Sequence, residues 1–290
     1  MAPFDREIEI EEQLKEAGNM LVTPPSSIDN LLKLLDRVEH LLANVEQAPS
    51  RSMQNALLPS MKALISTDLL GHLNMDVRVS VVSCISEITR ITAPDAPYND
   101  EQMKEIFHLT VAAFENLSHA SSCCYKKAIS ILDTVAKVRS CLVMLDLECD
   151  ALIIQMFQCF FKIIGSNHPH TVFLAMETIM TLVLDESEDI AFDLLHPLLA
   201  SVRKENKITL PMSWKLGEKV LSNCARKLRP YLMEMVQSTG ITLDEYSPLV
   251  ASICKSESNN LEHHNVNESG EILVQYSFFF LIFLMQISYL

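Results

Sequence analysis

The feature of this sequence that most constrains its fold is a set of apolar residues that recurs every 47 positions. Within each set the apolar residues are three or four positions apart, which is the spacing that lines one face of an α-helix. Four successive sets keep the same register: Leu34, Val38 and Leu41; Val81, Ile85 and Ile88; Ala128, Leu132 and Val135; Ala175, Ile179 and Leu182. A period of about 40–47 residues with two or three helices in each unit is typical of HEAT and armadillo arrays.

The segments between these helices repeat in the same way. Three apolar residues in one segment are matched 47 positions later in the next: Ile106, Leu109 and Phe114 against Ile153, Met156 and Phe161. The run from 212 to 229 no longer keeps the offset, although its pattern is still helical, and no run alternates as a strand would. The sequence therefore predicts an all-α fold, a HEAT-repeat α-solenoid of antiparallel helix pairs over residues 1–255, in which each repeat packs on its neighbours.

Local signals mark where some of these helices begin. Asn99 followed three positions later by Gln102 is a capping box. The segment "LNMDVRVSVVSCISEI" (73–88) resembles the start of the second helix of a HEAT repeat. In that interpretation Asp76 caps the helix, Val77 points into the core and Arg78 is the basic residue that such repeats usually carry.

The glycine content and the charge exclude several functional classes. Only 6 glycines occur in 290 residues, and no GxGxxG, GxxxxGK[ST] or GxSxG pattern is present. Nucleotide-binding loops and nucleophile elbows need glycine at those offsets. The formal net charge of −14 opposes direct binding to nucleic acid. We therefore predict a protein that is not an enzyme, needs no cofactor, and acts through protein partners.

Neither the cysteines nor the histidines form a metal-binding pattern. None of the 8 cysteines belongs to a CxxC pair, and we interpret them mostly as buried thiols of a reducing compartment. The adjacent Cys123 and Cys124 are either a redox-active pair or small residues packed at the start of a helix. His168, His170 and His196 have no cysteine or carboxylate at ligand spacing, so we predict no metal site.

Basic residues are concentrated in one segment of this acidic chain. They are Arg203, Lys204, Lys207, Lys215, Lys219, Arg226, Lys227 and Arg229. Two interpretations stay open. The segment is either a site for an acidic partner segment or an inositol polyphosphate, or the solvated face of its helices.

Two helical runs are joined by the stiff segment "ITAPDAPY" (91–98). Pro94 lacks an amide hydrogen and disfavours helical backbone at Ala93, and Pro97 does the same to Ala96. A segment that is ordered before anything binds loses little entropy when a partner docks onto it. On these grounds the segment is either a docking site or a connector that only joins two helices.

The longer segment "RVSVVSCISEITRITAPDAPYNDEQMKEIF" (78–107) resembles the cohesin-associated regulator family that is named for precocious dissociation of sister chromatids, and "APDAPY" is the hallmark segment of that family. The likeness covers about residues 10–255. It includes "LLKLLDRVEHLLANVEQ" (31–47), "ALISTDLLGHLNMDVRV" (63–79) and "LPMSWKLGEKVLSNCARKLRPYL" (210–232), and it points to the plant members.

The resemblance implies a nuclear HEAT scaffold that binds the cohesin ring through its kleisin subunit. Members of the family stabilise or release cohesin on chromatin, and so serve sister-chromatid cohesion, mitosis and DNA repair by homologous recombination. Releasing and protecting factors bind the hallmark segment through short motifs. That partner-binding role is carried over to Ala93, Pro94, Asp95, Ala96, Pro97 and Tyr98. Family members continue through many more repeats, including much of the kleisin-contacting region, so this chain resembles their N-terminal portion only.

The chain changes character after Lys255. Residues 256–271 are polar and are predicted to form a disordered linker. Residues 272–290, "ILVQYSFFFLIFLMQISYL", carry no charge, and about 20 apolar residues suffice to span a membrane. Three interpretations stay open: a membrane anchor, a helix packed on the solenoid, or sequence unrelated to the family. The anchor defines an alternative function, that of a tail-anchored helical adaptor at an intracellular membrane.

Overall fold

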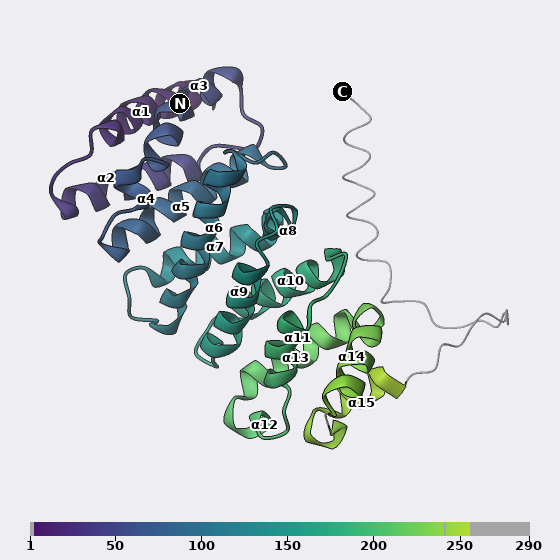
Figure 1. The fold of residues 1–290 in the computed structure, drawn as a ribbon. Helices are drawn as coiled ribbons and strands as arrows, with labels where there is room; N and C mark the ends of the chain where they lie inside the picture. The colour runs from purple at the N-terminus through teal and green to yellow at the C-terminus, as the bar shows by residue number, and fades with distance from the viewer. Residues whose placement is uncertain (1–2, 241, 256–290) are drawn as a thin grey trace. The chain divides into compact units, whose positions relative to one another are not determined.

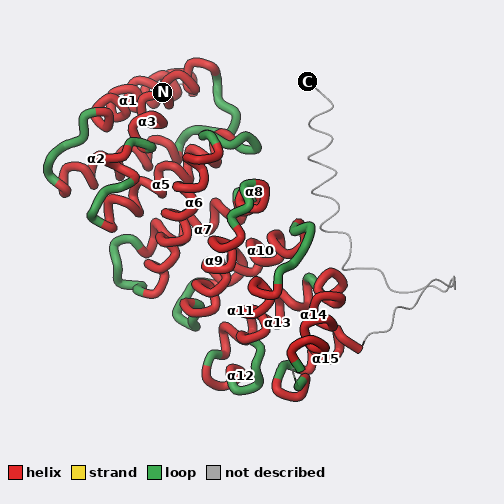
Figure 2. The backbone as a smooth tube through the Cα atoms, viewed as in Figure 1, coloured by secondary structure: helices red, strands yellow, loops and turns green. Residues whose placement is uncertain are grey.

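The computed structural model describes residues 3–240 and 242–255, and these residues form helices joined by loops (Figures 1 and 2). The described ranges contain no strand, only one isolated bridge between Arg203 and Tyr246. The α-helices are α1 (Pro3–Val22), α2 (Ile28–Ala43), α3 (Arg51–Leu64), α4 (Thr67–Leu70), α5 (Met75–Thr92), α6 (Asp100–Phe114), α7 (Tyr125–Val138), α8 (Cys141–Asp146), α9 (Asp150–Ile163), α10 (His170–Glu186), α11 (Phe192–Ser201), α12 (Asn206–Thr209), α13 (Pro211–Asn223), α14 (Ala225–Thr239) and α15 (Pro248–Lys255). Two 3-10 helices, η1 (Glu115–Ser118) and η2 (Leu243–Glu245), complete them.

The helices stack in two rows that follow the order of the chain (Figure 1). In the first row α2 packs on α5, α5 on α7, α7 on α10 and α10 on α13. In the second row α6 packs on α9 and α9 on α11, and contacts such as α5 with α6 and α11 with α13 join the rows. Such a stack of helix pairs is a HEAT-repeat solenoid, as the 47-residue period predicts.

Burial confirms the predicted register almost completely. The three marked residues of α2, of α5 and of α7 are all buried, and so are the six marked residues of α6 and α9. In α10 Ala175 and Ile179 are buried, but Leu182 is only half-buried while its neighbours Val183 and Leu184 are fully enclosed. The offset is lost at α13, which begins 41 residues after α10 (Pro211 against His170).

The predicted helix starts are correct at α6 and need a correction at α5. Asn99 and Gln102 form the capping box, with the Gln102 amide donating to Asn99 Oδ1 over 3.0 Å. Asp76, by contrast, does not cap α5. The helix begins at Met75, so Asn74 takes the cap position and accepts a hydrogen bond from the Val77 amide over 3.1 Å. Val77 itself is buried, as predicted.

One polar cluster connects three helices of the first row. Lys127 of α7 forms ion pairs with Glu39 and with Asp36 of α2, the latter over 2.8 Å. Ser83 of α5 donates to the second carboxylate oxygen of Glu39 over 2.8 Å. The side chain of Lys127 therefore extends past the intervening helix to the repeat beyond it.

The predicted linker (256–271) and the predicted apolar tail (272–290) lie outside the described residues. Among the helices that the structure describes, none has the length and apolar character needed to cross a membrane.

Candidate functional site: the connector between α5 and α6

The backbone of the connector departs from the helix where the prolines require it. Helix α5 ends at Thr92, and Ala93 is extended at φ −53° and ψ 138°, as expected for a residue before proline. The Ala93–Pro94 peptide bond is cis. The Asp95 amide donates to the Thr92 carbonyl over 3.0 Å, so the chain turns tightly before α6 begins at Asp100.

The loop between α2 and α3 holds the first half of the connector in place. The Gln47 side chain donates to the Ala93 carbonyl over 2.7 Å, and the Ala48 amide donates to the Ile91 carbonyl over 3.1 Å. Arg90 donates from its guanidinium to the carbonyls of Leu42 and Val45 over 3.0 and 2.9 Å. The Leu42 carbonyl belongs to the last turn of α2, and Val45 lies just beyond the end of the helix. Backbone acceptors at a helix C-terminus have no partner within the helix, and a positive charge is favoured there.

Sequence reasoning missed these anchoring residues, although a signal for them exists. Arg90 lies 45 and 48 positions after its two acceptors, and Gln47 lies 46 positions before Ala93. Each separation is close to the repeat period. Adding 47 to a residue at the end of α2 or in the loop after it therefore gives a position within two residues of its partner in the next repeat.

Tyr98 anchors the second half of the connector. Its ring is half-buried against the core, and its hydroxyl donates to the Met61 carbonyl of α3 over 3.2 Å. Burial, with a smaller contribution from Cys84, raises the pKa of the Tyr98 phenol far above its ordinary value. The phenol therefore stays protonated and keeps its hydrogen bond. The resemblance implies a partner-binding role for Tyr98, but its hydroxyl is already bonded to the Met61 carbonyl.

The exposed part of the connector is the middle of the predicted set. Pro94, Asp95 and Ala96 are exposed, whereas Ala93 and Pro97 are half-buried like Tyr98. No described residue bonds the carboxylate of Asp95. The structure thus brings all six predicted residues into one rigid turn, and it presents three of them to solvent.

A hollow borders the loop that holds the connector. Its volume is about 520 Å³, and it lies between α1 and residues 43–53. Its lining includes the apolar residues Ile10, Val45 and Met53 and the acidic residues Glu7 and Glu46. The α2–α3 loop therefore contacts the connector and also borders a concave surface.

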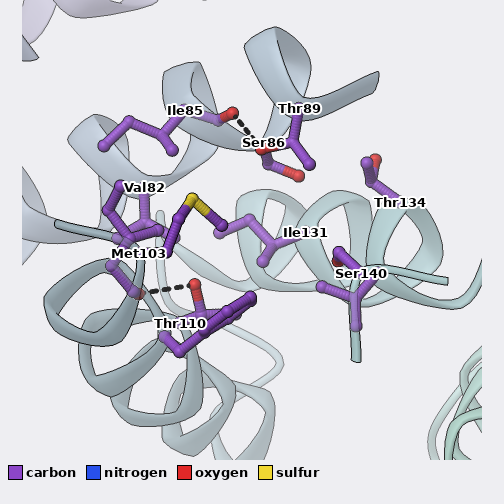
Figure 3. A pocket seen from close by; sticks show the side chains of 12 residues that line it. Val82, Ile85, Ser86, Thr89, Met103, Thr110, Ile131, Thr134 and Ser140 are labelled. Atoms are coloured by element: carbon purple, nitrogen blue, oxygen red, sulfur yellow. Dashed lines mark hydrogen bonds between the residues drawn. The ribbon is translucent and has the colours of Figure 1, made fainter. Parts of the chain in front are cut away.

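A small cavity lies between α5, α6 and α7, beside the helix that leads into the connector (Figure 3). Its volume is about 20 Å³, which is room for a water molecule and not for a substrate. Thr89 and Thr110 in its wall donate to carbonyls of their own helices over 3.0 and 2.8 Å. The Oγ atom of Ser86 is buried there without a hydrogen-bond partner among the described residues. The cavity therefore brings hydroxyl groups together, and none of its lining residues is a base that could activate one.

Two of the eight basic residues between 203 and 229 contact opposite ends of α10. Lys215 lies over the ring of Phe173, with 5.6 Å from Nζ to the ring centroid, near the start of α10. Lys227 donates to the carbonyl of Ser187, over 2.5 Å, and to that of Asp185, at the other end of the same helix. Twelve residues separate Phe173 from Asp185, which is about 18 Å along a helix axis. Lys215 and Lys227 are therefore well separated, and a binding patch formed by the eight basic residues stays a prediction.

His168 and most of the cysteines lie where they contribute to the packing of the helices and not to a binding site. His168 bonds the hydroxyl of Tyr125 over 2.9 Å and the carbonyl of Ile163 over 3.0 Å, so it fixes the turn between α9 and α10. Of the eight cysteines, all of them free, only Cys123 is exposed. The neighbour of the Cys123–Cys124 pair, Asp76, was not foreseen from the sequence.

Comparisons with known proteins agree on one family. The family model described as sister chromatid cohesion protein PDS5 matches residues 29–270. PDS5 homolog D of Arabidopsis thaliana is 59% identical over 89% of this chain and 31% of its own length. PDS5 homolog C of the same plant is 57% identical over 90% of this chain and 30% of its own length. The chain therefore spans about a third of the length of these relatives.

Human PDS5 homolog A is 26% identical over 71% of this chain and 16% of its own length. A solved structure, described as that of the Pds5–Scc1 complex with its implications for cohesin function, has a TM-score of 0.63 and 22% identity. The match covers 78% of this chain and 36% of that one. At this identity the likeness supports the fold, and it agrees with the solenoid described above.

Proposed function

This chain belongs to the PDS5 family of sister chromatid cohesion proteins, and from that premise we propose that it is a non-enzymatic cohesin cofactor that acts in the nucleus. In this proposal it regulates sister chromatid cohesion in mitosis by stabilising or releasing cohesin on chromatin. It also serves DNA repair by homologous recombination.

The observation that carries the proposal is the rigid, solvent-exposed turn at Pro94, Asp95 and Ala96. The turn is held from α2, α3, α5 and the α2–α3 loop, so its shape does not depend on a partner. A short peptide that docks on such a preformed surface loses entropy mainly on its own side. We assign the turn to short motifs of cohesin releasing and protecting factors, which would compete for one surface.

The cohesin ring itself is the second partner in this proposal. The structural neighbour was solved as a complex with Scc1, and we extend that kind of partnership, with the kleisin subunit, to this chain. The rows of packed helices form an extended surface of the kind on which solenoid proteins bind long partners. The negative net charge of the chain argues for binding to protein, not directly to DNA.

The test is a co-precipitation from plant nuclear extract with the full chain and two charge-reversed variants. Asp95→Arg changes the exposed turn, and Asp146→Arg makes the same change at an exposed position on α8. We expect the wild type and Asp146→Arg to recover both the kleisin subunit and a releasing factor. Asp95→Arg should recover the kleisin subunit but lose the releasing factor.

Two outcomes would refute parts of the proposal. Failure of the wild type to recover any cohesin subunit would remove the cohesin-cofactor function. Equal recovery of the releasing factor by wild type and Asp95→Arg would remove the docking role of the turn. Because both side chains are exposed, circular dichroism and thermal unfolding should match the wild type, which excludes misfolding as the cause.

A further inference from the structure

Three potential metal ligands meet at the N-terminal ends of α5 and α7. Asp76 lies in the first turn of α5, and Cys124 is the residue that precedes α7. The Cys124 Sγ lies 3.2 Å from Asp76 Oδ1 and 3.8 Å from the Sγ of Cys123. One ligand atom from each of the three residues falls within 4.8 Å of the other two.

The repeat period explains why residues so far apart in sequence meet here. Helices α5 and α7 are successive members of the first row and pack on each other. Adding one period of 47 residues to Asp76 gives position 123. The start of one repeat's helix therefore lies beside the start of the next. The ligand spacings expected of zinc motifs are much shorter, which is why the sequence alone predicts no site at this place.

The geometry matches half of a tetrahedral zinc site. With Zn–S bonds of about 2.3 Å at the tetrahedral angle, two thiolate sulfurs lie about 3.8 Å apart. That is the separation between the two sulfurs here. A carboxylate oxygen is a third ligand of the kind that such ions accept. Both sulfurs lie near the N-terminal end of α7. Burial and the neighbouring Asp76 raise the pKa of the Cys124 thiol, so the ion itself must displace the thiol proton when it binds.

We propose that Cys123, Cys124 and Asp76 bind one thiophilic divalent ion of the Zn²⁺ class. The two sulfurs and one carboxylate oxygen are its protein ligands, and the fourth position takes water or a group from a partner. On binding, each thiol releases its proton to solvent and donates a sulfur lone pair to the ion, which replaces the Cys124–Asp76 hydrogen bond. The exposed side chain of Cys123 gives the ion its route of entry, since Cys124 is buried. The ion ties the start of α5 to the start of α7.

Cobalt is a suitable probe, because tetrahedral Co²⁺ with thiolate ligands absorbs visible light and Zn²⁺ displaces it. The full chain, reduced with a phosphine and freed of metal by a chelator, is titrated with Co²⁺ and then with Zn²⁺. We expect one equivalent of Co²⁺ to give sulfur-to-metal charge-transfer and tetrahedral d–d bands, and one equivalent of Zn²⁺ to abolish them. Zn²⁺ should also raise the Tm.

Matched variants make the test specific. Cys123→Ser changes an exposed residue, so it should fold normally but bind at least about tenfold more weakly. Asp76→Asn should weaken binding in the same direction. Cys149→Ser changes a half-buried cysteine outside the cluster and should bind like the wild type. Absence of the thiolate bands in the wild type, or equal affinity of the wild type and Cys123→Ser, would overturn the proposal.

Discussion

Replacing Lys127 by methionine should destabilise the first row of helices far more than an ordinary surface ion pair would allow. Lys127 keeps 18% of its side chain exposed, and its partner Glu39 keeps 21%. The second partner, Asp36, is 61% exposed and adds little, because solvent screens such a pair. Methionine retains the apolar stem of the lysine, so the variant isolates the loss of the charge.

The expected loss follows from how much of each charge is buried. Removing one partner of a fully buried pair costs about 3–5 kcal/mol, and breaking an exposed pair costs at most about 1 kcal/mol. The Lys127–Glu39 pair is mostly buried, but Ser83 still donates to Glu39 after the change. We therefore expect the free energy of unfolding to fall by about 2–3 kcal/mol.

The stability that the Lys127–Glu39 pair contributes should fall as the pH rises into the alkaline range. Burial alone would lower the pKa of the Lys127 ammonium, but the hydrogen bonds and charges of Asp36 and Glu39 outweigh it and raise that pKa. A pKa raised by folding gives stability that is complete below the unfolded value of about 10.4 and is lost as pH rises through the folded value. The difference between wild type and Lys127→Met should thus be constant from about pH 7 to 9.5 and shrink above that range.

Urea denaturation followed by circular dichroism measures this difference. The control is Lys137→Met on the same helix, where Lys137 pairs with Asp133 over 2.7 Å and both side chains are exposed. That variant should lose no more than about 0.5 kcal/mol. Equal losses for the two lysine variants would refute the reasoning, because they would show that burial adds nothing to the pair. A lower m-value for Lys127→Met would mean that the repeats no longer unfold together.

Three further substitutions test the packing around the candidate site and along the solenoid. Gly217→Ala should cost roughly 1–3 kcal/mol, because the new Cβ would meet Ser201 Oγ and lie 2.8 Å from Val202 Cγ1; a urea midpoint unchanged from wild type would contradict this. Asn99→Ala removes the cap of α6 and should lower stability by about 1 kcal/mol in the same assay. Ser86→Ala should leave the Tm unchanged or raise it, since no protein partner is lost; a clear fall in Tm would count against it.

The sequence predicts the fold well because one physical constraint generates both the pattern and the architecture. A helix in a solenoid buries the face that meets the other row, so a register such as Val81, Ile85 and Ile88 recurs wherever a repeat does. The structure departs from the predictions at two positions, one set by the rotation of a helix about its axis and one by the residue at which a helix begins. Leu182 is half-buried because Val183 and Leu184 take the inner face of α10. Asp76 is not a cap because α5 begins at Met75, two residues earlier than a helix capped by Asp76 would begin.

The site was less predictable than the fold, because its exposure depends on contacts between repeats. Composition identifies the connector as stiff, and Pro94 has the expected effect on the backbone of Ala93. Nothing in the order of its residues says that Tyr98 turns toward Met61 while Asp95 faces solvent. That division depends on where α3 lies against the connector. It also separates two kinds of variant, since changes at Tyr98 should affect stability and changes at Asp95 should affect only recognition.

Polar contacts between neighbouring repeats join residues that lie about one repeat length apart in the sequence. Several polar contacts join residues 44 to 49 positions apart: Glu39 with Ser83, Leu35 with Cys84, Leu42 with Arg90, Gln47 with Ala93, Asp76 with Cys124, and Glu177 with Asn223. Each separation is close to one period, because successive helices of a row lie side by side at similar heights. The Lys127–Glu39 pair, at 88 positions, is close to two periods. In a solenoid, the polar partner of a residue should therefore be sought one or two repeat lengths along the sequence. The hydrogen bonds that hold the connector and the proposed metal site both follow from that spacing.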